Sequence, residues 1–594
     1  MSVADSTETD WVSRFADEVI SEAERRAPGE PIVCASGLSP SGPIHLGNLR
    51  EVMTPHLVAD EIRKRGHACV HLLSWDDYDR FRRVPAGVDP SWAEHVGKPL
   101  SSVPAPPGSD HASWADHFKA PMIEALAELG VDYRGISQTE QYTSGAYREQ
   151  ILTAMRERES IDAVLARYRT KQGEERPGAY YPYRPYCEMC ERDLTTVTAY
   201  DDDTTELAYS CACGFGETVR LAEHDRGKLV WKVDWPMRWA YEGVVFEPSG
   251  VDHHSPGSAW VVGGEIVGPV FGGERPIGPM YAFVGITGMA KMSSSKGDVP
   301  TPADALRIME APVLRWLYAR RKPSQSFKVA FDQEIQRLYD EWDALGRKVA
   351  QDEAQPAELA AHARAVRTSR GPLAATPRPV PYRTLASIAD VTTGDTGQIG
   401  RILGDLDGVA ALDEVRPRLD RAQAWIDTHV PADQRTRVRE SPDEELLGSL
   451  GEDERESLRM LTEGLDEHWS LEGLTTLVYG VPKLRAGLAA DAKPTPEVKA
   501  AQRAFFALLY RLLVGRDTGP RLPTLLLAVG AERVRKLARA CERRLPDHRH
   551  PGGGQVDRGA GARRAAAQGR ARAGRRVPPH GGHRRRADDP RRRR

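Results

Sequence analysis

The segment from Pro31 to Arg65 constrains the fold of this chain most strongly, because it predicts a strand, a glycine-bearing turn and a helix in succession. Residues 31–36 (PIVCAS) form an apolar run typical of a buried strand, and residues 37–42 (GLSPSG) favour a turn. A helix is expected from about Pro43. Its free N–H groups and its dipole would face an anion, so the segment predicts a phosphate-binding α/β unit. An ordinary Gly/Pro loop before a helix is the alternative.

Two side-chain patterns in and after this unit indicate ATP chemistry. His45 lies at the helix start, where an imidazole can donate a hydrogen bond to a phosphate oxygen that gains charge as pyrophosphate leaves. Gly47 offers bare backbone against which adenine can lie. Residues 285–297 (GITGMAKMSSSKG) contain Lys291, 246 residues after His45, and three serine hydroxyls. Either segment alone could be a surface loop, but in this order they predict one adenylate-forming site.

These two motifs carry a family resemblance. The sequence HLGN at 45–48, after SPSG, and the sequence KMSSS at 291–295 resemble the HIGH and KMSKS signatures of class I aminoacyl-tRNA synthetases. Stretches at 35–42, 74–82, 233–239 and 281–285 resemble class I lysyl-tRNA synthetases in particular, and the resemblance extends from about residue 10 to residue 537. It implies catalytic roles for His45, Asn48 and Lys291. It also implies an ATP site made of Pro40, Ser41, Gly42, His45, Gly47, Asn48, Lys291, Met292, Ser293, Ser294 and Ser295.

Two positions depart from the class signatures. Asn48 stands where the generic first signature has a histidine, so the donor there is an amide. Ser294 stands where the second signature has its second lysine, which leaves more of the phosphate charge to Lys291. Lys296 can supply the missing cation. We interpret both departures as traits of the lysyl subfamily.

The amino-acid pocket is expected beside the first motif. Asp76 and Asp77 follow the apolar run at 68–73 (ACVHLL), which places two carboxylates at the carboxyl end of a strand. They can hold a substrate ammonium group or position ATP, or they can simply cap a turn. An aromatic wall would suit the methylene stem and ammonium group of lysine, although large aromatics are also common in cores. The candidates are Trp231, Trp235, Trp239, His253 and Tyr281, with Gly37 and Ser39 for the α-groups of the substrate.

Four of the seven cysteines form a cluster. Cys187 and Cys190 are spaced as C-x-x-C, and Cys211 and Cys213 as C-x-C, with a strand-like run at 195–200 between the pairs. This pattern predicts a structural Zn²⁺ held by two knuckles. Free thiols or a redox pair are the alternatives. Four thiolates would leave no open position for a catalytic metal.

The expected fold class is α/β, with a Rossmann-like nucleotide-binding catalytic domain, a zinc-bearing insertion, and an all-α C-terminal domain that the resemblance assigns to anticodon binding. Residues 1–100 and 228–323 are expected to form the two halves of the catalytic domain, and residues 101–227 the insertion on the acceptor-stem side. Residues 324–545 carry helical apolar spacing. A purely structural role for these helices is the alternative.

Composition separates a tail from the rest of the chain. Residues 546–594 carry 15 Arg and 4 Asp, a net charge of +11, so the overall charge of −3 leaves −14 on residues 1–545. The tail is rich in Arg, Gly and Ala and cannot build a core. It predicts a disordered appendage, and a frameshifted reading of GC-rich sequence would give the same composition. Any tRNA surface on the acidic body must be a local basic patch.

The remaining expectations concern location and activity. No apolar run reaches the ~18 residues of a membrane span, and the polar start lacks the features of a signal peptide, so we expect a cytoplasmic enzyme with no membrane partner. The resemblance implies activation of L-lysine with ATP and Mg²⁺, then transfer to the terminal ribose of tRNA(Lys), with tRNA bound before the adenylate forms. DNA is not an expected partner.

Three alternative functions remain open from the sequence. A glutamate- or glutamine-type class I synthetase would need a cationic pocket for its amino acid. A nucleotidyltransferase that does not use tRNA would leave the helical region without a role. A non-catalytic zinc-bearing RNA-binding protein would carry both nucleotide motifs without using them.

Overall fold

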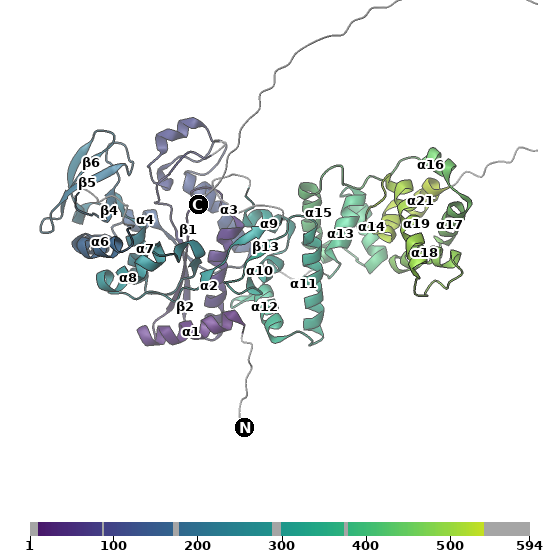
Figure 1. Ribbon diagram of the computed structural model, residues 1–594, viewed down its shortest axis with the longest axis horizontal. Coiled ribbons are helices and arrows are strands. Elements are labelled where there is room, and N and C mark those ends of the chain that lie inside the picture. The colour runs from purple at the N-terminus through teal and green to yellow at the C-terminus, as the bar shows by residue number, and fades with distance from the viewer. Residues whose placement is uncertain (1–9, 86–87, 170–177, 288–298, 374–377, 540–594) are drawn as a thin grey trace, which may run out of the picture. The chain divides into compact units, whose positions relative to one another are not determined.

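The computed structural model of the chain describes residues 10–85, 88–169, 178–287, 299–373 and 378–539 (Figure 1). Within these ranges, each helix is too short or too polar to cross a lipid bilayer. The predicted tail and five predicted ATP ligands lie outside the described residues: Lys291, Met292, Ser293, Ser294 and Ser295.

A four-stranded parallel sheet forms the centre of the N-terminal α/β part, in the order β3-β2-β1-β9. The helix α2 (Leu46–Lys64) connects β1 to β2, and these two strands stay in register from Ile32 opposite Cys69 to Leu38 opposite Trp75. This strand–helix–strand unit confirms the predicted α/β fold class. The strands are β1 (Ile32–Leu38), β2 (Cys69–Trp75), β3 (Arg134–Ser137) and β9 (Val244–Phe246).

Helices cover both faces of this sheet, as a parallel sheet requires. On one face, Cys34 and Leu73 pack in a core with residues of α1 (Trp11–Arg26) and α2. On the other face, Ala35 and Leu72 pack with residues of α7 (Trp231–Glu242) and α8 (Ala259–Phe271). Figure 1 shows β1 and β2 between these helices.

The sheet also takes a strand from the range expected to form the insertion. Strand β3 follows α3 (Trp114–Glu128) and pairs parallel with β2. Only Ile136 of its four residues is buried, so no apolar run indicated a strand. After β9 come two more parallel pairs, and Phe327–Val329 extends the α/β part past Pro323. These elements are β10 (Ser249–Gly250) with β11 (Met280–Tyr281), β12 (Val284–Ile286) with β13 (Phe327–Val329), α9 (Pro302–Ile308) and α10 (Ala311–Ala319).

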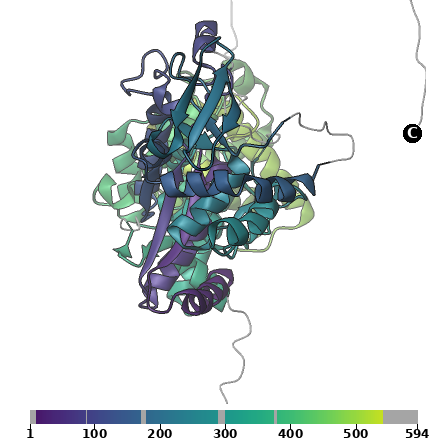
Figure 2. The same ribbon diagram turned by 90° about the vertical axis from the view of Figure 1, so that its left-hand side faces the viewer.

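The rest of the insertion is a small α+β unit, which faces the viewer in Figure 2. In its described part, three helices precede two antiparallel sheets. Residues of the helices and of the sheets share one buried core with α7 and α8. The elements are α4 (Gln138–Thr143), α5 (Arg148–Arg156), α6 (Arg158–Ala166), β4 (Tyr183–Pro185) paired with β8 (Gly227–Leu229), and the sheet of β5 (Thr195–Tyr200), β6 (Glu206–Cys211) and β7 (Gly216–Arg220).

Helices are the main elements among the described residues after β13. The apolar residues at 335, 338, 342 and 345 are all buried, as the helical spacing predicted. The first of these helices extend the hydrophobic core of the α/β part, whereas the last six of the described helices surround a separate core. The elements are α11 (Glu334–Ala350), α12 (Pro356–Val366), β14 (Arg367–Thr368), β15 (Gly371–Pro372), α13 (Tyr382–Thr392), α14 (Thr396–Asp407), α15 (Arg418–His429), α16 (Glu444–Ser449), α17 (Glu452–Gly464), α18 (Leu471–Arg485), α19 (Pro496–Val514), α20 (Leu522–Val529) and α21 (Ala531–Ala538).

Candidate active site

A cavity of about 270 Å³ lies at the carboxyl ends of β1 and β2, beside the N-terminus of α2. This is where an open parallel sheet binds its ligands. The structure brings eight of the predicted site residues to its lining: Gly37, Ser39, Ser41, Asn48, Asp76, Trp231, Trp235 and His253. We call it the amino-acid cavity, after the role predicted for five of these residues from the sequence alone: Gly37, Ser39, Asp76, Trp231 and Trp235, with His253 as a sixth.

His45 is the N-cap residue of α2, and this position sets its tautomer. Its Nδ1 accepts a hydrogen bond from the Gly47 N–H at 3.0 Å. Burial lowers the pKa of His45, so the imidazole is neutral and carries its proton on Nε2. His45 therefore offers one N–H donor at the helix N-terminus, where anions bind.

Asn48 completes the cap from the next turn. Its Oδ1 accepts a hydrogen bond from the His45 N–H at 3.2 Å, which leaves the Nδ2 amino group as the end that can donate. Ser41 and Asn48 both line the cavity, and the Ser41 carbonyl accepts from Trp114 Nε1 at 3.3 Å. Gly47 donates its N–H to His45, while Pro40 and Gly42 of the loop before α2 are buried.

Two glutamates that the sequence reasoning missed line the same cavity, Glu247 buried and Glu51 half-buried. Glu51 accepts from the Tyr281 hydroxyl at 3.1 Å and from the Gly37 N–H at 3.4 Å. Burial, with a contribution from the charge of Glu247, raises the pKa of Glu51 to about 8. Glu247 accepts from Trp235 Nε1 at 3.1 Å and from Trp239 Nε1 at 2.7 Å, and burial raises its pKa to about 7. Tyr281 therefore reaches the site through Glu51.

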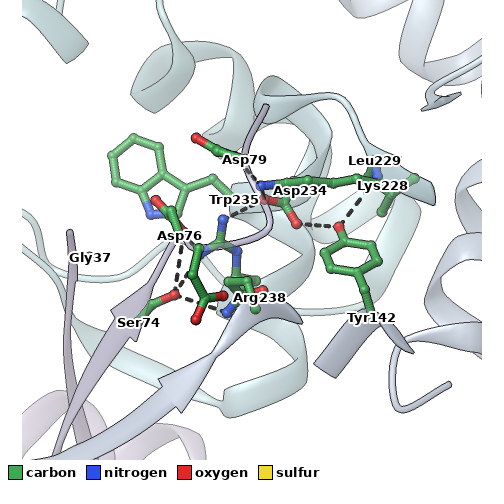
Figure 3. Close-up of polar contacts among 12 residues, drawn as sticks. Gly37, Ser74, Asp76, Asp79, Tyr142, Lys228, Leu229, Asp234, Trp235 and Arg238 are labelled. Atoms are coloured by element: carbon green, nitrogen blue, oxygen red, sulfur yellow. Dashed lines mark hydrogen bonds and ion pairs between the residues drawn. The ribbon is translucent and has the colours of Figure 1, made fainter. Parts of the chain in front are cut away.

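An ion-pair network fixes the carboxylate of Asp76 (Figure 3). Arg238 of α7 donates to Asp76 Oδ1 and to Ser74 Oγ, both at 2.8 Å, and its other amino group bonds Asp234. Asp234 is fully buried and also accepts from the Tyr142 hydroxyl. A buried carboxylate or guanidinium without its partner costs several kcal/mol, so the network holds these side chains in one arrangement.

The network continues to Lys228 at the end of the insertion. Its Nζ pairs with Asp79 and lies 3.6 Å from Asp234 Oδ2. Figure 3 shows Lys228 and Asp79 on one side of Asp234, and Asp76 with Ser74 on the other. Strand β8, helix α7 and the end of strand β2 are thereby tied together at the cavity.

Tryptophans form one wall. Trp231 and Trp235 stack with ring centroids 5.1 Å apart and planes 16° apart, and His253 meets Trp235 edge-on at 5.4 Å. Trp231 is 36% exposed, so its indole remains available to a ligand. Trp239, also considered from the sequence, is buried behind this wall and touches Trp260 at 5.1 Å.

Asp77 does not line the cavity. Its carboxylate accepts from Ser137 Oγ, from the Thr139 N–H and from Lys119, at 2.8, 2.8 and 3.1 Å. These bonds hold the start of α4 and join it to α3. The geometry gives Asp77 the capping role that was the alternative at this position.

The electrostatics of the amino-acid cavity favour a cation. Its charged lining residues are four carboxylates and one guanidinium, and that guanidinium is shared between Asp76 and Asp234. Glu242 is paired with Arg134 at 3.2 Å, but Glu51 and Glu247 have no cation as partner among the described residues. The cavity is therefore short of positive charge.

The four clustered cysteines converge as predicted. Their Sγ atoms lie within 4.8 Å of one another, with 3.7 Å between Cys187 and Cys213 and 3.6 Å between Cys190 and Cys211. Thiolates on a tetrahedral Zn²⁺, with Zn–S bonds of ~2.3 Å, stand about 3.8 Å apart. The donor set and its dimensions therefore fit a closed zinc site.

Comparison with known proteins gives one consistent family. The model of the tRNA synthetases class I (K) matches residues 9–371. A lysine–tRNA ligase of Streptomyces coelicolor is 69% identical, over 90% of this chain and 99% of that protein. The lysine–tRNA ligases of Treponema pallidum and Thermococcus kodakarensis are 32% and 33% identical, each over 89% of this chain and over 98% and 99% of their own lengths.

Proposed function

This chain belongs to the class I tRNA synthetases of the lysine type, and from that premise we propose how its cavity performs the reaction. The activity is that of a lysine–tRNA ligase, which uses ATP to join lysine to tRNA. The observation that carries our account is the excess of carboxylates over cationic side chains among the residues that line the amino-acid cavity. This charge suits the side chain of lysine and repels that of glutamate, and it offers the neutral side chain of glutamine no ion pair.

Glu51 binds the ε-ammonium group of lysine in this proposal. Its carboxylate is held by Tyr281 and by the backbone of Gly37, and it has no cationic partner among the described residues. The stacked indoles of Trp231 and Trp235 cover the methylene stem. Ser39 and the Asp76 carboxylate, fixed by Arg238, are placed for the α-groups.

ATP lies along the N-terminus of α2. The Nε2–H of His45 and the Nδ2 amide of Asn48 donate to phosphate oxygens, with the helix dipole behind them. Mg²⁺ bound with ATP would neutralise part of the triphosphate charge. Lys291 and the neighbouring serines, known here from the sequence alone, would hold the leaving pyrophosphate.

The chemistry needs positioning and electrostatics rather than a protein nucleophile. The lysine carboxylate attacks the α-phosphorus, the bond to pyrophosphate breaks, and His45 stabilises the charge that grows on the phosphate oxygens. The terminal 2′-hydroxyl of tRNA then attacks the carbonyl of the adenylate and releases AMP. A neutral histidine donor suits this role because it exchanges no proton with the reactants.

Two further assignments complete the proposal. Cys187, Cys190, Cys211 and Cys213 hold a structural Zn²⁺ that stiffens the turns around β5, β6 and β7 in an insertion directed to the acceptor stem. Residues 324–545 bind the anticodon side of tRNA(Lys). Because charging of tRNA serves translation, we place the enzyme in the cytoplasm.

The decisive experiment is ATP–pyrophosphate exchange with each standard amino acid in the presence of total tRNA. We expect exchange with lysine alone. Exchange with glutamate or glutamine would contradict the role of Glu51, and no exchange with any amino acid would favour a non-catalytic RNA-binding protein. Omitting tRNA from the same assay tests whether tRNA must bind before the adenylate forms.

A further inference from the structure

Arg50, the fifth residue of α2, is a buried cation that makes no ion pair with any described carboxylate. It is 2% exposed, and burial lowers the pKa of Arg50 to about 10, so it remains charged at neutral pH. Its guanidinium group bonds three backbone carbonyls instead. Nη1 donates to Ala282 at 2.9 Å and to Gln325 at 2.8 Å, and Nη2 donates to Lys322 at 2.7 Å. Burying a charge is costly, and an apolar side chain would avoid that cost. The role of Arg50 therefore lies in the three carbonyls that it holds.

These carbonyls belong to the two chain segments that precede β12 and β13. Ala282 lies just before β12, whereas Lys322 and Gln325 lie between α10 and β13. The two strands pair in parallel along their full length, and the Ala282 N–H donates to the Pro323 carbonyl at 2.8 Å. The guanidinium group also lies over the ring of Phe327, the first residue of β13, 5.3 Å from its centroid. One side chain thus ties α2 to both strands at the end where they begin.

This strand pair matters because the second signature follows β12 closely in the chain. Residues 288–298, which include Lys291, come between β12 and α9. Helix α2 is also bonded to the chain after them, because the Leu46 N–H donates to the Pro300 carbonyl at 3.1 Å. The same helix has His45 at its N-terminus. Its first two turns are therefore bonded to the chain both before and after the second signature.

We propose that Arg50 is a positioning residue for adenylate formation, which holds the strand before the second signature in a fixed place relative to His45. Both signatures must hold the triphosphate of ATP while the α-phosphorus is attacked in line, and a misplacement of ~1 Å can slow such a step about 100-fold. Arg50 contacts neither lysine nor ATP and acts through the backbone that it fixes. The inference rests on the proposed function, because it takes Lys291 to act on ATP.

The test compares Arg50→Lys and Arg50→Met with the parent, as full-length enzymes with lysine, ATP and tRNA(Lys). Rates of ATP–pyrophosphate exchange are expressed per lysine-binding site, counted by calorimetry, so that unfolded protein does not lower them. We expect Arg50→Met to reduce kcat about 100-fold while the Kd for lysine changes less than about twofold. Arg50→Lys should reduce kcat about tenfold, because an ammonium group keeps the charge but lacks the planar fork that reaches three carbonyls. If Arg50→Met does not fold, Arg50→Lys decides the question.

Arg315 supplies a matched control, because it is the same kind of group in another place. It is fully buried, makes no ion pair with any described carboxylate, and has a pKa that burial lowers to about 10. It donates to the carbonyls of Leu129 at 2.7 Å and Arg364 at 2.8 Å and to His56 Nε2 at 3.1 Å, none of which borders a signature. Arg315→Lys should lower the stability against urea as Arg50→Lys does, but should leave kcat per binding site unchanged.

Three results would overturn the proposal. Equal losses of kcat in Arg50→Lys and Arg315→Lys would mean that both arginines only support the fold. Arg50→Lys with the kcat of the parent would show that the rate does not depend on the guanidinium fork. A Kd for lysine that weakens as much as kcat falls would place the effect in the amino-acid cavity. A parent enzyme without lysine-dependent exchange would instead contradict the proposed function, before any variant is compared.

Discussion

Glu51→Gln gives the sharpest test of the amino-acid cavity. Without lysine, the raised pKa of about 8 means that only about one-tenth of the Glu51 side chains are ionised at pH 7. A bound ε-ammonium group favours the carboxylate, so lysine binding must release the proton. The glutamine variant keeps the shape and the acceptor for Tyr281 but has no charge to offer.

The size of the effect follows from these values. A charge-assisted hydrogen bond in a buried site contributes about 1.5–3 kcal/mol, or roughly 10- to 150-fold in Kd. The full advantage of Glu51 over glutamine should therefore develop above pH 8, shrink by about tenfold at pH 7, and nearly vanish at pH 6. Lysine binds more tightly as the pH rises, because the free enzyme then has less proton to lose.

Isothermal titration calorimetry with lysine at several pH values measures both the Kd for lysine and the number of protons released on binding. Repeating the titration at pH 7 in buffers of different ionisation enthalpy counts protons, and we expect about 0.9 released from Glu51 for each lysine bound. The groups that face Glu51 are the carboxylates of Glu247 and Asp76, the Tyr281 hydroxyl and the Gly37 N–H. Glu247 has a pKa of about 7 and contributes to the proton release on lysine binding. The Glu247→Gln variant is therefore titrated in parallel with the parent enzyme.

Glu242→Gln is the matched control, since this carboxylate also lines the cavity but is paired with Arg134. We expect Glu242→Gln to change the affinity for lysine only slightly. A parent enzyme whose Kd for lysine stays constant from pH 6 to pH 8, with no proton released, would refute the assignment of Glu51 to the ammonium group.

Four further predictions follow from the same structure. His45→Asn keeps an acceptor for the helix cap but loses the Nε2–H donor, so adenylate formation should slow about 100-fold while the affinity for lysine is unchanged, as rapid-quench and equilibrium measurements would show. Lys291→Ala should likewise abolish most pyrophosphate exchange without weakening lysine binding. Arg238→Met removes the cation that is paired with the buried Asp76 and leaves Asp234 with only Lys228, so it should cost about 3–5 kcal/mol in urea unfolding, with a raised KM for lysine. Metal analysis should find one zinc per chain, and Cys211→Ser or chelation should lower the temperature at which the insertion unfolds.

Much of the fold could be predicted because local patterns and packing agree. The apolar run at 68–73 and the glycine-bearing turn before α2 placed β1, α2 and β2 within a few residues of their observed bounds. Strand β3 could not be predicted in this way. It is short and mostly exposed, and it exists as a strand because β2 offers it an edge with which to pair. Sequence periodicity does not reveal a strand that forms only because a neighbouring strand pairs with it.

The site shows the same division. Residues within a motif or directly after a predicted strand, such as Asn48 and Asp76, could be predicted because their place along a helix or strand fixes where they point. Glu51 and Glu247 were missed because each follows a motif without belonging to it. A signal existed for Arg238, since Asp234 lies four residues earlier on the same helix and this spacing predicts an ion pair. Charged residues inside apolar segments are the general sequence signal for site residues of this kind.

Glu51 and Glu247 also explain how the cavity can prefer lysine without a shape that fits lysine alone. Burial raises the pKa of Glu51 to about 8 and that of Glu247 to about 7, so at neutral pH Glu51 is mostly protonated and Glu247 about half protonated, and the empty cavity avoids much of the cost of holding two charges. An ammonium group restores the charged form and gains the full electrostatic attraction, whereas a neutral side chain meets only protonated acids. Shape need not reject a neutral amino acid of similar length. Discrimination should therefore weaken at low pH, and glutamine or norleucine should compete with lysine best below about pH 6, where both acids remain protonated.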